Sequence, residues 1–346
     1  MAVHTPESVG RQHHEWTWRY FCLLMQIYLL RMLAYIEVAL TDNLRPKVKD
    51  DVKVTMIQVP SRDPGRTIKA ALYEPVDMPQ GPRPVNVNAH GSGFCIPAFF
   101  GNSRFFLYLT ARKLRCYAID VCYRKSPEYP YPFPTQDVED VVNWVFTQPD
   151  KFDLSRVSMT GFSAGGNLAL STTNRLGRDK ITAVVSFYAP LDATTSGAPV
   201  GFRGNYTKEF RSGVELLPWA FSGFFSSFVP MQTDPGDPYL SVINSPLDRF
   251  PDYVLFVAGM SDVMYSDSKA MYEHMVESGT IGQKQHCRFL QVPNEAHAFD
   301  EQPKCRESEE WRDRAYLTSI DTIFKSWYPQ AEPLPMELDA VAPLHL

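Results

Sequence analysis

Residues Arg156 to Leu170 read Arg-Val-Ser-Met-Thr-Gly-Phe-Ser-Ala-Gly-Gly-Asn-Leu-Ala-Leu and are the most informative part of the chain. A short β-prone run enters a Gly-x-Ser-x-Gly turn, and a run of good helix formers follows it. Small residues around Ser163 permit a sharp strand-to-helix turn that lifts the serine hydroxyl clear of a sheet. The N–H groups and the dipole of the following helix favour a developing negative charge there. The stretch therefore predicts a nucleophilic serine.

Strand-like and helical runs alternate along the rest of the chain. We expect strands over Val52–Pro60, Thr67–Tyr73, Val85–Ala89, Cys116–Cys122, Arg156–Thr160, Ala183–Tyr188, Tyr253–Ala258 and His286–Val292. We expect helices directly after Ser163 and over Ser103–Arg115, Pro134–Gln148, Ser266–Ser278 and Glu309–Trp327. This alternation predicts an α/β fold with a mostly parallel central sheet and helices on both of its faces.

Composition excludes several classes of protein. The chain has 346 residues, 44% of them hydrophobic, which is enough for a sizeable core. A net charge of -5 argues against a general nucleic-acid binder, because no basic field would gather phosphates. The six cysteines form no Cys-x-x-Cys pair, and the histidines lack metal-ligand spacing, so we expect reduced thiols, no metal and no cofactor. The N-terminus does not resemble a signal peptide, and we expect a cytoplasmic protein.

An apolar stretch from Tyr20 to Leu40 is interrupted by Gln26, Arg31 and Glu37. Its uncharged runs are shorter than the roughly 20 apolar residues that span a bilayer. We therefore expect an amphipathic helix whose apolar stripe packs on the body of the protein. A helix lying on a membrane surface is the less favoured alternative.

Residues Asp192 to Pro238 break the alternation of strands and helices, and they are rich in Gly, Pro and aromatic residues. Two interpretations stay open for this segment: a lid over the site, or an irregular segment whose aromatic side chains fill ordinary core. The residues from Ala331 to the end are dotted with proline, and we expect a flexible tail there.

A nucleophilic serine needs a base, and the base needs a group that orients it. Behind such an elbow the acid and then the histidine follow along the chain, each after a strand. His297 lies on a loop directly after the predicted strand that ends at Val292, which makes it the candidate base. The other downstream histidines are expected in a helix, at the start of a strand and in the tail (His274, His286 and His345).

The acid is expected on the loop after the preceding strand. Asp262 follows Tyr253–Ala258 within four residues and is the candidate that would orient His297. Asp267 is the alternative, but it falls in the first turn of a predicted helix, where a carboxylate has an ordinary stabilising role.

Acyl transfer also needs donors for the oxyanion of a tetrahedral intermediate. The sequence His90-Gly91-Ser92-Gly93-Phe94 follows the strand Val85–Ala89, where the upstream donor is expected. The N–H of Ala164, next to the nucleophile, is the expected second donor. We expect His90 to fix the loop by hydrogen bonding rather than to act as a catalyst.

Taken together, these motifs resemble the hormone-sensitive-lipase-like family of α/β-hydrolases, which comprises carboxylesterases and lipases. His90 to Phe94 is similar to its His-Gly-Gly-Gly-Phe/Trp motif, and Gly161 to Gly166 to its Gly-Asp-Ser-Ala-Gly-Gly. Tyr123 to Pro132 is similar to its Tyr-Arg-Leu-Ala-Pro-Glu-x-Pro-x-Pro, and Asp237-Pro238-Tyr239 with Ser245-Pro246-Leu247 looks like the segment before its acid loop. The resemblance runs from about Val52 to Trp327.

The resemblance implies an α/β-hydrolase fold with a helical cap. Residues 1–50 would form an N-terminal cap region, 51–330 the catalytic domain with a cap insertion at about 192–238, and 331–346 the tail. It implies Ser163 as nucleophile, Asp262 as acid and His297 as base. The implied oxyanion donors are the backbone N–H groups of Ser92, Gly93 and Ala164, with His90 and Gly91 as supporting motif residues.

Two residues depart from the family pattern. Ser92 replaces a motif glycine, so its loop must tolerate a Cβ atom. Phe162 replaces the aspartate before the nucleophile and is expected to make the surroundings of the elbow more apolar. Both substitutions leave the catalytic groups in place and are expected to retune substrate choice.

The motifs predict a serine-dependent carboxylic-ester hydrolase for a small to medium apolar ester, such as an acylated natural product. An acyltransferase, lyase or cyclase on the same fold is the alternative, because a dry elbow would favour an acceptor other than water. A ligand-binding receptor is less favoured, since all three triad members are present. The expected partner is a small-molecule ester, with membrane contact not favoured and the oligomeric state open.

Overall fold

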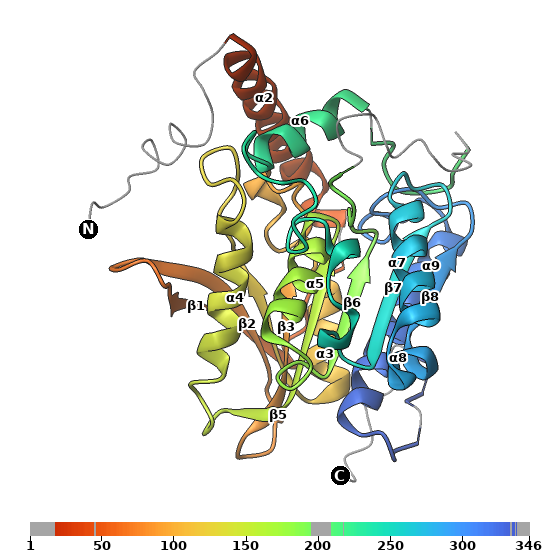
Figure 1. Cartoon of the computed structure of the whole chain (residues 1–346). Coiled ribbons are helices and arrows are strands. Elements are labelled where there is room, and N and C mark those ends of the chain that lie inside the picture. The colour runs from red at the N-terminus through yellow and green to blue at the C-terminus, as the bar shows by residue number, and fades with distance from the viewer. Residues whose placement is uncertain are drawn as a thin grey trace.

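An eight-stranded sheet forms the centre of the molecule (Figure 1). The computed structural model describes residues 18–44, 46–194, 209–216, 218–332, 334–335 and 337. In chain order the strands are β1 (Val52–Pro60), β2 (Thr67–Pro75), β3 (Arg83–Ala89), β4 (Tyr117–Val121), β5 (Phe152–Phe162), β6 (Ala183–Phe187), β7 (Tyr253–Gly259) and β8 (Arg288–Val292). Their order in the sheet is β1-β2-β4-β3-β5-β6-β7-β8, and β2 is antiparallel to both of its neighbours while the pairs from β4 to β8 are parallel. The predicted, mostly parallel sheet is confirmed.

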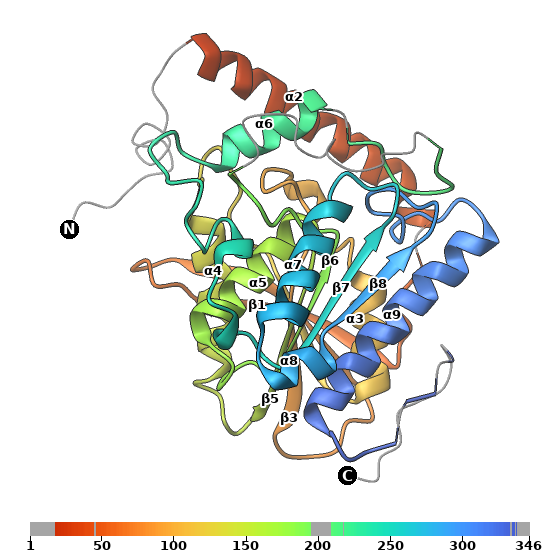
Figure 2. The same ribbon diagram turned by 45° about the vertical axis from the view of Figure 1, so that its right-hand side comes forward.

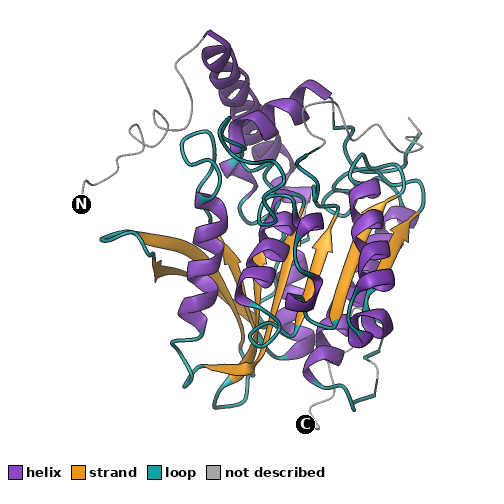
Figure 3. Cartoon of the chain, in the orientation of Figure 1, coloured by secondary structure: helices purple, strands orange, loops and turns teal. Residues whose placement is uncertain are grey.

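Helices cover both faces of this sheet (Figure 3). One face packs on α4 (Phe133–Val145), α5 (Ala164–Leu176) and α7 (Tyr265–Ser278), and the other on α3 (Arg104–Leu114) and α9 (Arg306–Trp327). Each face has its own apolar core, because the β-branched and aromatic residues of the central strands are buried on both sides. Short 3₁₀ helices lie at η1 (Asp42–Leu44), η2 (Pro97–Phe99), η4 (Val242–Asn244) and η5 (Leu247–Arg249).

The predicted start of the last strand is wrong by two residues. A short helix, α8 (Ile281–His286), precedes β8, and His286 is its last residue instead of the first residue of a strand. Thr280 and Gln283 form a capping box, in which each side chain accepts a hydrogen bond from the other residue's backbone N–H. This reciprocal cap stabilises a helix that is too short to show a periodic apolar pattern.

Two helices lie across the carboxyl ends of the parallel strands: α2 (Trp18–Thr41) and α6 (Pro218–Phe228) (Figure 2). The two helices pack against each other. The Gln26 side chain donates to the Trp219 carbonyl at 2.8 Å, and a Cβ atom on Gly223 would lie 2.5 Å from Gln26. The α6 helix lies within the irregular segment of the sequence and was not predicted as a helix. Part of that segment, residues 195–208 and 217, lies outside the described residues.

The orientation of α2 differs from the expected one. Ile27 and Ala34 are buried, but most large apolar side chains of this helix are exposed. The polar residues Gln26 and Arg31 point instead toward the body of the protein, where they make hydrogen bonds. In the described part of the chain, Tyr20–Thr41 is also the one helix whose length and mean hydropathy would suffice to cross a bilayer. The expectation of a buried apolar stripe is therefore wrong for most of α2.

The start of the C-terminal tail packs on the body. Leu334 is buried in the core beside α3 and α9, and the Lys113 side chain donates a hydrogen bond to the Glu337 carbonyl. The expectation of a flexible tail therefore does not hold at these positions. Residues 338–346 lie outside the described part of the chain.

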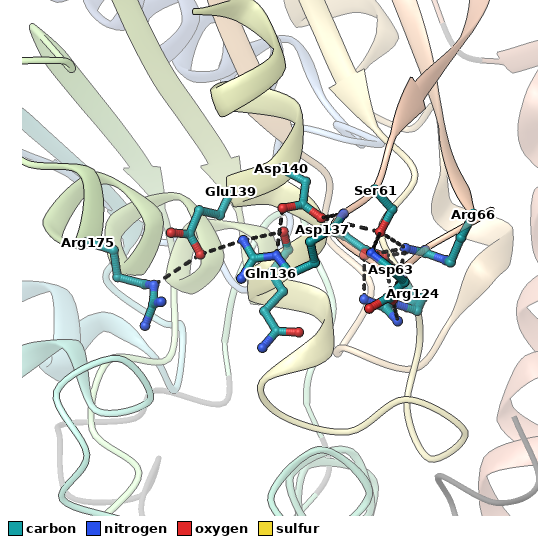
Figure 4. Close-up of polar contacts among 10 residues, drawn as sticks. Ser61, Asp63, Arg66, Arg124, Gln136, Asp137, Glu139, Asp140 and Arg175 are labelled. Atoms are coloured by element: carbon teal, nitrogen blue, oxygen red, sulfur yellow. Dashed lines mark hydrogen bonds and ion pairs between the residues drawn. The ribbon is translucent and has the colours of Figure 1, made fainter. Parts of the chain in front are cut away.

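A network of ion pairs fixes the segment that follows β4 (Figure 4). At its centre the buried Asp137 of α4 accepts two hydrogen bonds from Arg66, at 2.8 and 2.7 Å, and one from the backbone N–H of Arg124, at 2.9 Å. Arg124 also pairs with Asp63 in the turn between β1 and β2. Breaking a buried pair of this kind leaves a charge without compensation. The network therefore anchors the start of the Tyr-Arg motif at the end of β4.

Candidate active site

Ser163 occupies a sharp turn between β5 and α5. Its backbone has φ 51° and ψ -121°, a strained conformation for a residue with a side chain. A Cβ atom on Gly161 would lie 2.1 Å from the Gly165 carbonyl oxygen, and one on Gly165 would lie 1.9 Å from the carbonyl oxygen of Ala89. Both positions require glycine, because no real Cβ atom approaches backbone this closely. The geometry is that of the predicted nucleophile elbow.

The structure brings together Ser163, His297 and Asp262. His297 Nε2 lies 2.9 Å from Ser163 Oγ, and its Nδ1 lies 2.9 Å from Asp262 Oδ2. With the ring proton on Nδ1, the histidine donates to the carboxylate and accepts from the serine hydroxyl. The other carboxylate oxygen of Asp262 accepts from the Met264 backbone N–H at 2.9 Å, which fixes its orientation. All three side chains come from loops at the carboxyl ends of strands.

The electrostatic surroundings of His297 suit a general base. Burial of the ring opposes protonation, but the charge of Asp262 and its hydrogen bond outweigh this effect and raise the pKa of His297 above 6.5. Glu301 and Asp300 act in the same direction. A histidine of this kind takes up the serine proton more readily than a free imidazole would.

This raised pKa predicts the acid side of the pH–rate profile. Only neutral His297 can accept the Ser163 proton, so kcat/KM should fall as pH drops through the His297 pKa, with a midpoint above 6.5. Replacing Asp262 by asparagine removes the charge that raises this pKa, and the midpoint should move to lower pH. Initial rates of ester hydrolysis between pH 5 and pH 9 measure it, and a midpoint that does not move would contradict the assignment.

The alternative acid, Asp267, has a different structural role. Its carboxylate accepts hydrogen bonds from the backbone N–H groups of Leu191, at 2.9 Å, and Asp192, at 3.3 Å. It therefore fixes the loop after β6, away from the imidazole of His297.

The loop after β3 approaches the elbow closely. A Cβ atom on Gly91 would lie 3.3 Å from the Phe162 carbonyl oxygen, and Gly93 has φ +52°. A Cβ atom on Gly93 would also lie 2.9 Å from the ring of Phe224 in α6. The loop thus lies between the elbow and the helix above it, beside Ser163.

The predicted oxyanion donors line the same cavity as the serine. In the described part of the chain, the backbone N–H groups of Ser92, Gly93 and Ala164 make no hydrogen bond to another residue. Backbone N–H groups at a helix start and in a glycine-containing loop are the donors that an oxyanion requires.

Ser92 fits its loop because its hydroxyl has a partner. Its Oγ lies 2.7 Å from the Tyr123 hydroxyl, which itself donates to the carbonyl of His90 at 2.6 Å. The ring of Tyr123 stacks on the imidazole of His90, with 4.7 Å between the ring centroids. His90 therefore supports the loop through its carbonyl and ring packing. The serine at the glycine position adds a hydrogen bond that a glycine lacks.

Replacing Tyr123 with phenylalanine should loosen this loop. The buried Ser92 hydroxyl and His90 carbonyl would lose their partner, and the free energy of unfolding should fall by about 1–3 kcal/mol. We expect kcat to fall by about tenfold, with a smaller change in KM, because the loop donors act mainly in the transition state. Steady-state kinetics measure both constants. Tyr117→Phe is the matched control, since that hydroxyl faces Glu74 at the other end of β4; equal kcat values for the two variants would refute this role.

Phe162 does not enter the cavity. Its ring stacks on Phe187 with centroids 4.4 Å apart and contacts Phe106 edge-on at 5.4 Å. The side chain is thus part of the core under α3 and α9. The expectation that Phe162 retunes substrate choice through the surroundings of the elbow is not supported by this placement.

Sequence reasoning missed the residues that hold the loop of His297. The buried carboxylate of Glu295 accepts from the backbone N–H of Ser212 and from the Arg211 side chain, both at 3.0 Å. The Val214 N–H donates to the His297 carbonyl at 2.7 Å. The irregular segment before α6 therefore supports the base loop. No periodic pattern in the sequence links these distant positions.

Tyr188 is a second missed residue. It follows β6, and the edge of its ring meets the His297 imidazole with centroids 4.8 Å apart. Its hydroxyl donates to the buried carboxylate of Asp300 at 2.7 Å, and Tyr316 donates to the other oxygen at 2.8 Å. These contacts limit the movement of the imidazole toward the sheet.

Above the serine lies a cavity of about 600 Å³. Ser163, Ala164 and His297 form part of its floor, and apolar side chains of α2 and α6 line it, including Leu30, Trp219, Phe221, Phe224 and Phe225. Phe228, by contrast, stacks on Phe94 with centroids 3.7 Å apart and is buried in the core. The aromatic side chains of α6 thus divide between the wall of the cavity and the core. Phe202 and Tyr206 of the irregular segment lie outside the described residues.

Comparisons with known proteins agree with this architecture. A family model described as alpha/beta hydrolase fold matches residues 86–301, more than half of the chain. A probable carboxylesterase 7 of Arabidopsis thaliana is 25% identical over 265 residues, covering 68% of this chain and 77% of the relative. A versiconal hemiacetal acetate esterase of Dothistroma septosporum is 24% identical over 230 residues, covering 63% of this chain and 68% of the relative.

Solved structures give the same fold. An esterase of Pyrobaculum calidifontis superposes with a TM-score of 0.70 at 21% identity, covering 87% of this chain and 93% of that one. At this level of identity the similarity concerns the fold alone. The family match and the related carboxylesterases identify the family. The chain belongs to the carboxylesterase-type, hormone-sensitive-lipase-like family of α/β-hydrolases.

Proposed function

We propose that this protein hydrolyses carboxylic esters through a covalent acyl-enzyme on Ser163. The proposal rests on two contacts at the floor of an apolar cavity. His297 lies 2.9 Å from the Ser163 hydroxyl through Nε2 and 2.9 Å from the Asp262 carboxylate through Nδ1. A serine becomes an effective nucleophile when a neighbouring base is held in the correct tautomer.

In the first half of the reaction, Ser163 Oγ attacks the ester carbonyl while His297 Nε2 takes the hydroxyl proton. The new oxyanion is held by the backbone N–H groups of Ser92, Gly93 and Ala164. The charge of Asp262 stabilises the imidazolium that forms. His297 then gives its proton to the leaving alkoxide oxygen, and the alcohol departs.

In the second half, a water molecule attacks the acyl-enzyme. His297 takes a proton from the water, and the oxyanion returns to the same backbone donors. Collapse of this intermediate releases the carboxylic acid and returns the proton to Ser163. Each proton transfer uses the same imidazole nitrogen, so one geometry serves both halves.

The cavity supports a small to medium apolar ester as substrate. Its volume of about 600 Å³ lies in the range of sites for drug-sized ligands, and aromatic side chains of α6 dominate its roof. One relative carries the name of an esterase for versiconal hemiacetal acetate, a natural-product ester. We therefore favour an acylated natural product over a long-chain lipid.

The proposal is tested by the hydrolysis of p-nitrophenyl esters of increasing acyl length. We expect turnover by the unaltered protein and a loss of kcat of at least about 10⁴-fold in Ser163→Ala. Product analysis in the presence of an added alcohol separates hydrolysis from acyl transfer. Free acid as the main product supports a hydrolase, whereas a new ester as the main product points to an acyltransferase. Undiminished activity of Ser163→Ala would refute the proposal.

A further inference from the structure

The outward face of α2 is apolar along its whole length. Ten large apolar side chains of this helix are between 47% and 76% exposed. They are Trp18, Phe21, Met25, Tyr28, Leu29, Met32, Leu33, Tyr35, Ile36 and Leu40. Single exposed apolar residues are ordinary, but a continuous exposed strip of this kind marks an interaction site.

The polar residues of the same helix face the body of the protein. Gln26 donates to the Trp219 carbonyl, and Arg31 donates to the carbonyls of Cys95 and Ser126 and to the carboxylate of Glu128. A soluble surface helix turns its polar side to water, whereas here Gln26 and Arg31 point inward beside the buried Ile27 and Ala34. These contacts also hold α2 against the body and fix its orientation, so its apolar face points outward.

A phospholipid surface suits this face better than a second copy of the chain. The helix has 24 residues and is about 36 Å long, so a strip about 10 Å wide offers roughly 400 Å². A stable dimer buries about 800 Å² on each partner, twice this area. A lipid surface has no such requirement, because an amphipathic helix binds it through its own apolar face.

The chemistry of the strip also matches a membrane interface. It carries tryptophan and tyrosine among aliphatic residues, and these aromatic side chains are enriched where hydrocarbon meets head groups. The strip itself has no charged side chain, which fits hydrocarbon. Arg31 is engaged by the body, so α2 would lie on the surface rather than cross it.

We propose that the outward face of α2 docks on a phospholipid surface, from which the protein takes its apolar ester. The second part rests on the proposed esterase function. It follows from the position of α2, because Leu30 on the opposite side of the same helix lines the substrate cavity together with Trp219 and Phe224 of α6. An ester dissolved in the lipid would then be separated from the substrate cavity by the thickness of this helix.

The docking is tested by flotation with vesicles of phosphatidylcholine that contain a minor share of phosphatidylserine. The full chain is used with Ser163→Ala, so that binding is measured without catalysis. We expect the protein to float with the vesicles. The triple variant Leu29→Glu, Met32→Glu and Ile36→Glu should lower the bound-to-free ratio at least about tenfold, because carboxylates do not enter hydrocarbon. A matched triple variant on other exposed apolar residues (Val54→Glu, Met56→Glu and Ile281→Glu) should float like the parent.

Each other outcome overturns the docking. These are a parent protein that stays in the aqueous fraction, a triple variant of α2 that floats equally well, or a dimer in sedimentation velocity that the α2 variant abolishes without any vesicle binding. Resistance to alkaline carbonate extraction would show a spanning helix instead. When Ser163 is left unchanged, both triple variants should hydrolyse a soluble p-nitrophenyl ester at the rate of the unaltered protein. Loss of flotation with intact hydrolysis thus separates this inference from the proposed function.

Discussion

Replacing Asp262 by asparagine is expected to lower kcat by about 10³- to 10⁴-fold with little change in KM. Asparagine keeps the shape of the side chain, but it removes the charge that stabilises the imidazolium of His297. Its amide nitrogen also favours the wrong tautomer of the ring, because a donor placed beside Nδ1 leaves the proton on Nε2, where it faces Ser163. Steady-state kinetics on a short p-nitrophenyl ester measure this effect.

Asp267→Asn is the control for this variant. Its carboxylate accepts from two backbone N–H groups, and the amide oxygen of asparagine can still accept from them. We expect a change in kcat of less than about tenfold, since no catalytic proton passes through this residue. A larger loss of kcat in Asp267→Asn than in Asp262→Asn would make Asp267 the acid.

Replacing Gly165 by alanine is expected to prevent the elbow from forming. The new Cβ atom would lie 1.9 Å from the Ala89 carbonyl oxygen and 2.5 Å from that of His90, both on rigid backbone at the end of β3. Because packed backbone cannot yield by more than an ångström without breaking strand contacts, we expect a loss of at least about 3 kcal/mol of unfolding free energy. Soluble yield and the midpoint of thermal unfolding measure this loss.

Gly91→Ala provides the comparison for this stability effect. Its Cβ atom would lie 3.3 Å from the nearest atom, the Phe162 carbonyl oxygen, so a small adjustment suffices. Its thermal midpoint should lie well above that of Gly165→Ala. Equal midpoints for the two variants would mean that the close packing of helix α5 on β3 is not what requires glycine in the elbow.

The parts of the site that depend on local order along the chain could be predicted from sequence. Ser163, Asp262 and His297 each follow a β-prone run directly, and parallel strands bring such positions to one edge of a sheet. The helix α8 was missed because its six residues are too few to show a periodic apolar pattern, although the spacing of Thr280 and Gln283 is that of a capping box. An element can be predicted from sequence only where it is long enough to show a pattern along the chain.

The residues that could not be predicted act through contacts between distant segments. Glu295 holds Ser212, more than eighty positions earlier, and neither residue belongs to a motif. The orientation of α2 was predicted wrongly for the same reason. Its periodic pattern shows two faces but not which of them the body binds, and Arg31 decides this by pairing with Glu128, 97 residues away. The buried face therefore combines Gln26 and Arg31 with Ile27 and Ala34, while most of the large apolar side chains face outward.

Covalent labelling tests whether Ser163 is a nucleophile activated by His297. A fluorophosphonate carries a good leaving group and mimics the tetrahedral intermediate, so attack by an activated serine gives a stable phosphonylated residue. Intact mass followed by peptide mapping should show one added phosphonyl group on Ser163, and the rate of labelling should fall sharply in His297→Ala. Labelling at another residue, or equally fast labelling in Ser163→Ala, would contradict the account.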